Sequence, residues 1–388
     1  MAKRADRVAG FGTTIFTEIN QLAQQHNALN LGQGKPDFDG PAEIIDAAVQ
    51  ALQQGALNQY APGPGAASLR QAVADHARRF YHMEISPTEG VVVTAGATEA
   101  IFSCVLGLVD RGDEVIVIEP YFDSYVPNIT MAGAKPVFVP LRPPTWTFDP
   151  EELRRAFNKR TRALILNTPH NPSGRVFTRQ ELTLIAELCR EHDVTVISDE
   201  VYEHLIFDSA CHIPIASLPG MFDRTVTVSS LGKTFSVTGW KIGWVYGAPE
   251  LVRGVAQAHQ FVTFAVNHPA QQAAAFALSL PESYFADFKK MYTGKRDLLM
   301  SALRRGGLSP TLPEGTYFIM ADFSSVFDGD DIEFARYLTS EVGVACIPPT
   351  FFYSHDHAHM ASTQARFAFC KSDEMLREVG ERMALLGR

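Results

Sequence analysis

The stretch SSLGKTFSVTGWKIGW, residues 229–244, sets Lys233 between a glycine and a threonine. Gly-Lys-Thr invites a phosphate-loop interpretation, in which a glycine-rich loop cradles phosphates and its lysine reaches the outer ones. That motif needs another glycine five positions before Gly232, but the chain has Thr227 there. The sequence therefore disfavours a nucleotide triphosphatase. Two roles for Lys233 stay open: a solvated lysine in a polar turn, or a lysine that forms a covalent bond.

The composition limits the classes of partner and compartment. A chain of 388 residues with 46% hydrophobic residues can bury a large core, and its length predicts about two domains. The net charge of −9 argues against binding of nucleic acid or an anionic membrane, because both recruit basic patches. The chain has no apolar run of membrane-spanning length, and its start, MAKRADRVAGFG, lacks the apolar core of a secretory signal. We expect a cytoplasmic protein.

Neither the cysteines nor a histidine-rich segment predicts a metal site. The cysteines are odd in number and lack the paired spacing of zinc or redox sites, which indicates idle thiols in a reducing compartment. The segment SHDHAHM carries His355, His357 and His359, and their alternation in a polar loop is typical of a solvated lid. We therefore expect no metal. The cysteines are Cys104, Cys189, Cys211, Cys346 and Cys370.

Short runs rich in valine and isoleucine alternate with longer helical patterns along the first three quarters of the chain. This alternation is the signature of an α/β sheet built from strand–helix–strand units. In TRQELTLIAELCREH, which starts at residue 178, Leu182, Ile185, Ala186 and Cys189 share one helical face. The predicted strands are VVVT at 91, EVIVIE at 114, PVFV at 136, ALILN at 163, VTVIS at 194, TVTVS at 225 and IGWVYG at 242.

Polar and aromatic residues collect directly after these strands. Ligands of such sheets bind beyond the carboxyl ends of the strands, so the residues there are expected to form one site. Each residue alone has a structural explanation, such as a turn or a helix cap, but together they indicate a functional site. The residues are Thr98, Phe122, Asn171, Asp199, Tyr202, Ser230 and Lys233.

This set suits a pyridoxal cofactor. A lysine amine forms Schiff bases with carbonyls, and a carboxylate facing a pyridine nitrogen is the partner that such a cofactor requires. Asp199, at the end of a strand, is therefore a candidate for holding that nitrogen protonated. Gly96, Ala97 and Thr98 lie between a strand and a helical run, where backbone N–H groups and a helix N-terminus attract a phosphate. The hydroxyl of Ser230 and the positive charge of Lys241 are expected to contribute to the same phosphate site.

A series of sequence motifs runs along nearly the whole chain, and through them the chain resembles the class I and II aminotransferases of the type I pyridoxal-phosphate fold. Among these enzymes, the chain is similar to the branch of methionine aminotransferase, kynurenine aminotransferase and glutamine transaminase K. The resemblance implies a large pyridoxal-phosphate-binding domain at 41–290, with a mostly parallel seven-stranded sheet between helices. It also implies a smaller α/β domain and an N-terminal arm, made of 1–40 with 291–388. The motifs are GTTIFTEI, NLGQGKPDFDGP, NQYAPGPGAASLRQAV, TAGATEA, NTPHNPSGRVF, SDEVYEHL, SSLGKTFSVTGWKIGW, PEGTYFIMAD and RFAFCKSDEML.

The resemblance also implies roles for the cofactor-binding residues. Lys233 resembles the lysine that holds pyridoxal 5'-phosphate as an aldimine, and with Asp199 and Tyr202 it forms the catalytic set. Asn171 and Tyr202 are expected to bond the phenolic oxygen of the cofactor, and Phe122 to stack on its ring. Tyr60 is expected to reach the phosphate of a neighbouring subunit, which requires a homodimer with shared sites. The same resemblance implies cis peptide bonds before Pro120 and Pro172.

On the substrate side, Arg366 resembles the clamp for the α-carboxylate, assisted by Gly34 and Asn171. Ile15 and Phe16 are expected to line the side-chain pocket. The pocket segments add Phe264, Phe351 and Phe352 and provide no arginine, which favours a bulky neutral amino acid. Lys35 departs from the branch, whose members carry an apolar residue there, and its side chain is expected to reach either the pocket mouth or, preferentially, solvent.

Three functions fit these residues. The first is an aminotransferase with ping-pong chemistry, in which Lys233 also moves the α-proton. The second is a cysteine-conjugate β-lyase that cuts carbon–sulfur bonds on the same site. The third is a sensor that keeps the cofactor without turnover, which the lack of a DNA-binding segment weakens. The sequence favours the first and barely separates it from the second.

Overall fold

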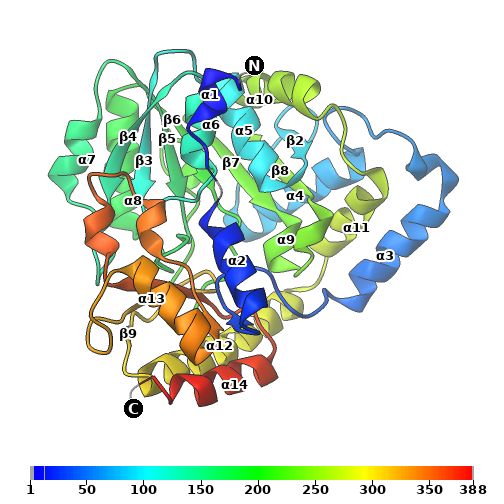
Figure 1. The fold of residues 1–388 in the computed structure, drawn as a ribbon. Coiled ribbons are helices and arrows are strands. Elements are labelled where there is room, and N and C mark those ends of the chain that lie inside the picture. The colour runs from blue at the N-terminus through cyan, green and yellow to red at the C-terminus, as the bar shows by residue number, and fades with distance from the viewer. Residues whose placement is uncertain (1–3, 13, 387–388) are drawn as a thin grey trace.

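A seven-stranded sheet forms the centre of the computed structural model, which describes residues 4–12 and 14–386 (Figure 1). Thr13 of the GTTIF segment and residues 1–3 and 387–388 of the predicted small domain lie outside the described residues. All seven predicted strands are present, so the predicted α/β fold with a mostly parallel seven-stranded sheet is confirmed. The strands are β2 (Val91–Thr94), β3 (Glu114–Glu119), β4 (Lys135–Pro140), β5 (Thr161–Asn167), β6 (Thr195–Asp199), β7 (Thr225–Ser230) and β8 (Gly243–Gly247).

The order of the strands brings their carboxyl ends to one edge. The order is β2-β8-β7-β6-β5-β3-β4, in which only β8 runs antiparallel to its neighbours. Gly243, the first residue of β8, pairs with Thr94 at the end of β2 and with Ser230 at the end of β7. The turn that enters β8 therefore lies at the same edge as the segments that leave the parallel strands, which is where ligands bind in such sheets.

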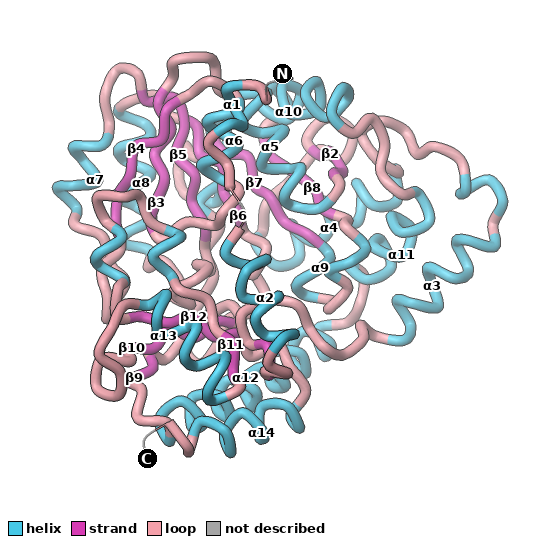
Figure 2. The backbone as a smooth tube through the Cα atoms, in the orientation of Figure 1, coloured by secondary structure: helices cyan, strands magenta, loops and turns pink. Residues whose placement is uncertain are grey.

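Helices cover both faces of this sheet, as Figures 1 and 2 show. In β3, Val115 and Val117 pack against residues of α5, α6 and α10, whereas Ile116 and Ile118 pack against α7 and α8. Successive side chains of a strand point to opposite faces, so burial of both faces accounts for the uninterrupted apolar run. The α-helices between residues 42 and 278, the part of the chain that contains the sheet, are α3 (Ala42–Gln53), α4 (Ala67–Tyr81), α5 (Gly96–Leu108), α6 (Tyr125–Met131), α7 (Pro150–Ala156), α8 (Arg179–Glu191), α9 (Leu231–Thr234), α10 (Pro249–Val262) and α11 (His268–Leu278).

Helix α8 confirms the helical pattern that starts at residue 178. The Thr178 hydroxyl accepts from the Glu181 N–H while the Glu181 carboxylate accepts from the Thr178 N–H, which is a capping box. The predicted apolar face is buried, and the helix ends at Glu191. The buried residues include Leu182, Ile185, Ala186 and Cys189.

A second core joins the two ends of the described chain. β1 (Leu29–Asn30) pairs in parallel with β11 (Val344–Ala345), and β10 (Phe318–Asp322) lies between β12 (Gln364–Ala368) and β9 (Ser309–Pro310). Ile19 and Leu31 are buried in one cluster with C-terminal residues such as Phe367. The helices here are α2 (Ile15–Gln25), α12 (Glu282–Arg305), α13 (Asp331–Tyr337) and α14 (Asp373–Met383), whereas α1 (Asp6–Ala9) lies against α6 at the central sheet (Figure 1).

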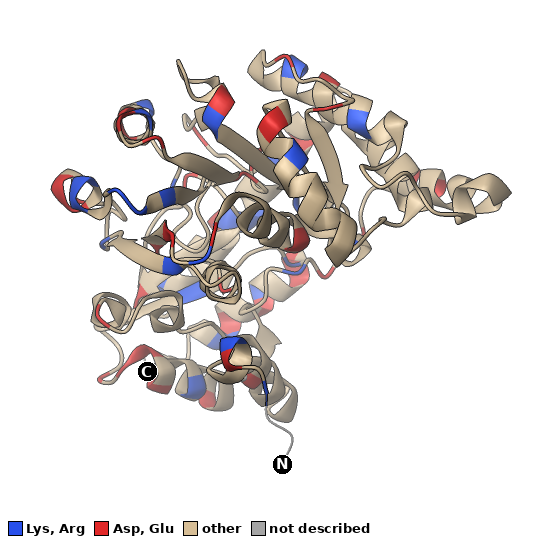
Figure 3. Ribbon diagram, turned by 90° about the horizontal axis from the view of Figure 1, so that it is seen from above, with Lys and Arg blue, Asp and Glu red and all other residues tan. Residues whose placement is uncertain are grey.

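Three global features bear on the sequence predictions. The peptide bonds before Pro120 and Pro172 are cis, as predicted, and those before Pro144 and Pro169 are cis as well. None of the helices in the described ranges has the length and apolar composition that crossing a membrane requires. Figure 3 shows basic and acidic residues interspersed along the helices.

Candidate active site

A cavity of about 640 Å³, counted to its open mouth, lies at the carboxyl edge of the central sheet. Its walls come from segments that follow β2, β3, β5, β6 and β7 and from the turn before β8. The structure brings ten predicted site residues together there: Gly96, Ala97, Thr98, Phe122, Asn171, Asp199, Tyr202, Ser230, Lys233 and Lys241.

One end of the cavity gathers the groups predicted to hold a phosphate. Helix α5 begins at Gly96, so the unpaired N–H groups of its first turn belong to cavity residues. The Nζ of Lys241 donates to the Thr98 hydroxyl at 3.4 Å. Gly96 has a φ of +75°, and a Cβ there would lie 3.2 Å from the Lys241 Nζ, so glycine allows this approach. A helix N-terminus beside an ammonium and a hydroxyl suits a phosphate group.

Lys233 lies directly after β7, and its amine meets a tyrosine. The Nζ donates to the Tyr317 hydroxyl at 3.0 Å, and this hydroxyl donates to the Gly34 carbonyl oxygen at 2.7 Å. Burial lowers the pKa of Lys233 to about 8. An amine with this pKa is neutral in part of the molecules near neutral pH, and the neutral form bonds to carbonyls and accepts protons.

Asp199 ends β6 and is buried. The Tyr125 hydroxyl donates to its Oδ2 at 2.5 Å, and the Val201 N–H donates to its Oδ1 at 3.4 Å. Burial raises the pKa of Asp199 to about 6, although these hydrogen bonds act in the opposite direction. Because a buried carboxylate is costly without a cationic partner, this position favours a positively charged group in the cavity.

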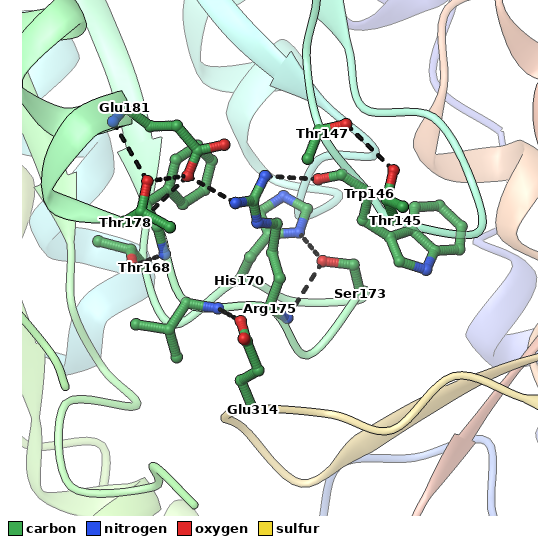
Figure 4. A network of polar contacts seen from close by, with 12 residues as sticks. Thr145, Trp146, Thr147, Thr168, His170, Ser173, Arg175, Thr178, Glu181 and Glu314 are labelled. Atoms are coloured by element: carbon green, nitrogen blue, oxygen red, sulfur yellow. Dashed lines mark hydrogen bonds and ion pairs between the residues drawn. The ribbon is translucent and has the colours of Figure 1, made fainter. Parts of the chain in front are cut away.

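Asn171 sits on a loop that a buried polar network holds beneath the cavity. Figure 4 shows Arg175 between the Trp146 carbonyl and the Glu181 carboxylate, to which it donates at 2.7 and 2.6 Å. On the cavity side, the Asn171 N–H donates to the Asn167 Oδ1 at 2.8 Å. Side-chain and backbone bonds thus fix this loop at both ends, which orients the Asn171 amide.

Arg366, on β12, is buried beside the cavity but is not among its lining residues. Its Nη1 donates to the Asn171 Oδ1 at 3.1 Å and its Nη2 to the Gly32 carbonyl oxygen at 2.8 Å. The carbonyl of Gly34, which was predicted to assist this clamp, accepts from the Tyr317 hydroxyl. The Nε of Arg366 is buried with no hydrogen-bond partner among the described residues. Burial lowers the pKa of Arg366 to about 10, so the guanidinium stays charged at neutral pH.

Aromatic rings surround the Arg366 guanidinium. Its carbon lies 4.2 Å from the ring centroid of Phe318, 5.1 Å from that of Phe352 and 5.2 Å from that of Phe16. Phe16 therefore contacts the predicted clamp. Neither Phe16 nor Ile15, the two residues predicted to line the side-chain pocket, lines the cavity itself, and Ile15 is buried in the hydrophobic core. An arginine among rings is desolvated, which strengthens its attraction for a carboxylate.

Other predicted residues lie apart from the cavity of their own chain. Tyr60 is 83% exposed and contacts the exposed Phe264, with ring centroids 5.4 Å apart. Phe351 is also exposed. Lys35 is exposed and does not line the cavity, in agreement with the preferred alternative that its side chain reaches solvent.

The histidine-rich loop differs from the predicted solvated lid at one residue. The Nδ1 of His357 pairs with the Oε2 of Glu119 at 2.5 Å, and this glutamate is completely buried. His355 and His359 are exposed. The loop is thus attached to the end of β3 through His357, because a buried carboxylate requires a partner.

Several site residues were missed from the sequence, although each lies within or near a segment that was noted. Tyr317 and Phe318 belong to PEGTYFIMAD, Asn167 to NTPHNPSGRVF, and Tyr125 follows the predicted strand EVIVIE. A polar or aromatic residue near a strand end was the available signal, but contact depends on which way each side chain points. Further lining residues that were not predicted are Ile101, Val201, Gly232, Thr238 and Ile242.

Comparison with known proteins defines the class to which this fold and site belong. Residues 26–383 match the family described as aminotransferase class I and II. This match covers most of the chain, and the strand order and the cavity agree with it. The chain belongs to the class I and II aminotransferases.

Particular relatives resemble the chain over nearly its whole length. A kynurenine–oxoglutarate transaminase of Dictyostelium discoideum is 40% identical over 99% of this chain and 96% of its own. A probable N-succinyldiaminopimelate aminotransferase, DapC, of Mycobacterium tuberculosis is 45% identical over 98% of both chains. The solved structure of YbdL from Escherichia coli, identified as having a methionine aminotransferase function, superposes with a TM-score of 0.95 at 39% identity, over 99% of this chain and 100% of that one.

The chain is therefore an aminotransferase, a transferase of nitrogenous groups that acts on amino and oxo acids. The class is known to use pyridoxal phosphate. The residues of this cavity fit that group in three respects: the first turn of α5, Thr98 and Lys241 offer N–H, hydroxyl and ammonium groups to a phosphate, Asp199 is a buried acid suited to a cationic nitrogen, and Lys233 is a partly neutral amine.

Proposed function

We propose that this chain is a pyridoxal-phosphate-dependent aminotransferase that moves the amino group of a bulky neutral amino acid to a 2-oxo acid. The donor product leaves before the acceptor binds, in two half-reactions. The observation that carries the proposal is the buried Arg366, whose Nε lacks a partner, beside a cavity that contains Lys233 and Asp199. Relatives named for kynurenine and methionine support the substrate class.

The residues proposed to hold the cofactor act on its separate parts. The first turn of α5, Thr98, Ser230 and Lys241 would hold the phosphate, and Asp199 would hold a proton on the pyridine nitrogen. Asn171 and Tyr202 would bond the phenolic oxygen, and Phe122 would cover one ring face. When bound, the cofactor supplies an aldehyde to which amines bond and a ring that accepts electrons.

The chain's own groups would then orient the substrate and move its proton. Arg366 binds the α-carboxylate, and Asn171 keeps the guanidinium in place. Lys233 takes the proton from the α-carbon and returns it as general acid, while the Tyr317 hydroxyl orients the amine. The rings of Phe16 and Phe318 exclude water from the clamp, which strengthens its ion pair with substrate.

The aromatic surroundings of Arg366 favour a neutral side chain. A second carboxylate in a closed site requires a second cation, because an unpaired buried charge is costly. Phe16, Phe318 and Phe352 contribute apolar surface there, and Lys35 is exposed. Methionine, aromatic amino acids, glutamine and kynurenine meet this requirement.

Steady-state kinetics with methionine, phenylalanine, glutamine, kynurenine, N-succinyldiaminopimelate and aspartate, each against a common 2-oxo acid, test the proposal. We expect parallel double-reciprocal lines and a kcat/KM for a neutral donor at least about 10-fold above that for aspartate, since one mismatched buried charge costs more than 1.4 kcal/mol. Lys35→Phe serves as the matched variant and should leave this order unchanged.

Other results would redirect the assignment. A preference for aspartate that disappears in Lys35→Phe would mean that Lys35 supplies the second cation. A preference for N-succinyldiaminopimelate would associate the chain with the DapC relative instead. Pyruvate and ammonia released from a cysteine conjugate without any oxo acid would favour the β-lyase alternative.

We also propose a homodimer in which Tyr60 completes the phosphate site of the neighbour. The exposure of Tyr60 and its contact with Phe264 support a surface that a second subunit covers. Tyr60→Ala should raise the Kd for the cofactor about 10-fold, as loss of one hydrogen bond to a charged group predicts, and Phe351→Ala serves as an exposed-aromatic control. Equilibrium dialysis and sedimentation check this; an active monomer would contradict it.

The domain division and the compartment are proposals as well. We propose a large domain at 41–290 and, beside it, a small domain with an N-terminal arm, made of 1–40 with 291–388. The pairing of β1 with β11 supports this division, as does the core that Ile19 and Leu31 share with Phe367. All five cysteines are free thiols, and four of them are buried, which supports a reducing compartment such as the cytoplasm.

A further inference from the structure

Three potential metal ligands lie together between helix α4 and the turn after β6, outside the active-site cavity. They are His76, Glu203 and His204, and one ligand atom from each lies within 4.8 Å of the others. The two Nε2 atoms of the histidines are 2.7 Å apart and face each other. Across the described ranges of the chain, no other trio of histidine, cysteine or acidic side chains is close enough to share an ion.

Two hydroxyl groups orient the carboxylate of this cluster. The Tyr81 hydroxyl donates to the Oε2 of Glu203 and the Ser229 hydroxyl to its Oε1, each at 2.6 Å. A carboxylate has about four acceptor positions, so each oxygen keeps one free for a cation. Metal-binding carboxylates are commonly held by such outer hydrogen bonds, which fix their direction.

The charge of Glu203 also favours a cation. Its side chain is 5% exposed, and the hydrogen bonds to its carboxylate come from the Tyr81 and Ser229 hydroxyls rather than from a lysine or arginine. The neighbouring buried acid, Glu200, already pairs with His212 at 2.7 Å. A buried carboxylate that is bonded only to neutral hydroxyls keeps an uncompensated charge, which is costly in an apolar interior.

We propose that His76, Glu203 and His204 form a binding site for a divalent transition-metal ion, with Zn²⁺ as the ion that this ligand set fits. Two imidazoles and one carboxylate are ligands that zinc accepts, and a water completes the four positions. Four ligands placed tetrahedrally about 2.1 Å from zinc lie roughly 3.4 Å from one another. The Glu203 oxygen, within 4.8 Å of the histidine nitrogens, must therefore approach by up to about 1.4 Å, and the two nitrogens, now 2.7 Å apart, must separate by about 0.7 Å.

This site would connect two parts of the fold that matter for activity. His76 belongs to α4, whereas Glu203 and His204 directly follow Tyr202, which lines the active-site cavity. His204 is the least buried of the three. A bound ion would tie α4 to the turn that carries Tyr202, and thereby stabilise the folded chain and the wall of the cavity.

Isothermal titration of the chelator-treated holoenzyme with Zn²⁺ tests the site. We expect one ion per chain and a thermal midpoint that rises with the Zn²⁺ concentration. His76→Gln and His204→Gln should each raise the Kd for zinc at least about 10-fold, as loss of one ligand requires. His355→Gln, a fully exposed histidine in the other histidine-rich segment, is the control and should bind zinc like the parent.

A second measurement needs no variant. A crystal of the parent protein soaked in Zn²⁺ should give an anomalous difference peak between the Nε2 atoms of His76 and His204 and the Glu203 carboxylate. Absence of this peak, or zinc affinity that both glutamine variants retain, would overturn the proposal. In that case the two histidines form only a neutral hydrogen-bonded pair.

Discussion

Replacement of Lys233 by alanine is expected to lower kcat about 10⁴-fold, the upper range for loss of a general acid and base. Lys233 lines the cavity, and burial, which lowers its pKa to about 8, prepares its amine to accept a proton. The variant should still bind pyridoxal phosphate, because Thr98, Ser230 and Lys241 remain. Single-turnover and steady-state assays measure the loss, and borohydride treatment of the parent should link the cofactor to Lys233 in peptide mass spectrometry.

Two further lysines separate this role from general effects of charge. Lys290 is exposed, so Lys290→Ala should leave kcat unchanged. Lys241 donates to Thr98 at the phosphate end, so Lys241→Ala should weaken cofactor binding while changing kcat at saturating cofactor much less. If Lys233→Ala retained appreciable steady-state transamination, Lys233 would not be the proton carrier.

The central sheet could be predicted because its physical signal is local. Each strand is buried on both faces, so each appears as a run such as EVIVIE, and the alternation with helical patterns fixes a parallel arrangement. Residues at the carboxyl ends of those strands converge for the same reason, which is why Asp199, Asn171 and Lys233 were found together. The antiparallel direction of β8 carries no comparable signal, because its sequence is equally apolar.

The parts that escaped prediction depend on contacts between distant segments. Tyr317 accepts from the Lys233 amine, and the Gly32 carbonyl accepts from the Arg366 guanidinium, and neither contact was predicted. Which carbonyl of the segment faces the guanidinium depends on how that segment packs against β12, and the sequence alone does not specify this packing. His357 likewise pairs with Glu119 only because the fold brings its loop to the end of β3.

Replacement of Asp199 by asparagine is expected to lower kcat about 10²–10³-fold, the effect of losing one preorganised charge in a closed site. The asparagine has nearly the same shape and keeps an oxygen that can accept from the Tyr125 hydroxyl. It cannot hold a proton on a pyridine nitrogen by charge attraction. Tyr125→Phe is the control, because it removes only the hydrogen bond to Asp199, and it should reduce kcat less. Asn167→Asp would not serve as a control, because it adds a charge.

The same substitution should stabilise the cofactor-free protein, and the pH dependence identifies the cause. Burial raises the folded-state pKa of Asp199 to about 6, against about 3.9 for an ordinary aspartate. A raised pKa means that the folded state binds the proton more tightly, so this contribution to stability is present below about pH 4 and is lost as the pH rises through 6. Above that pH, Asp199→Asn should increase the free energy of unfolding by up to about 3 kcal/mol, and by about half as much at pH 5. Urea denaturation at pH 5 and pH 8 measures both values. An asparagine variant that is less stable than the parent at pH 8 would mean that the charge of Asp199 is already compensated within the protein, and the argument that its burial prepares the cavity for a cationic ring would fail.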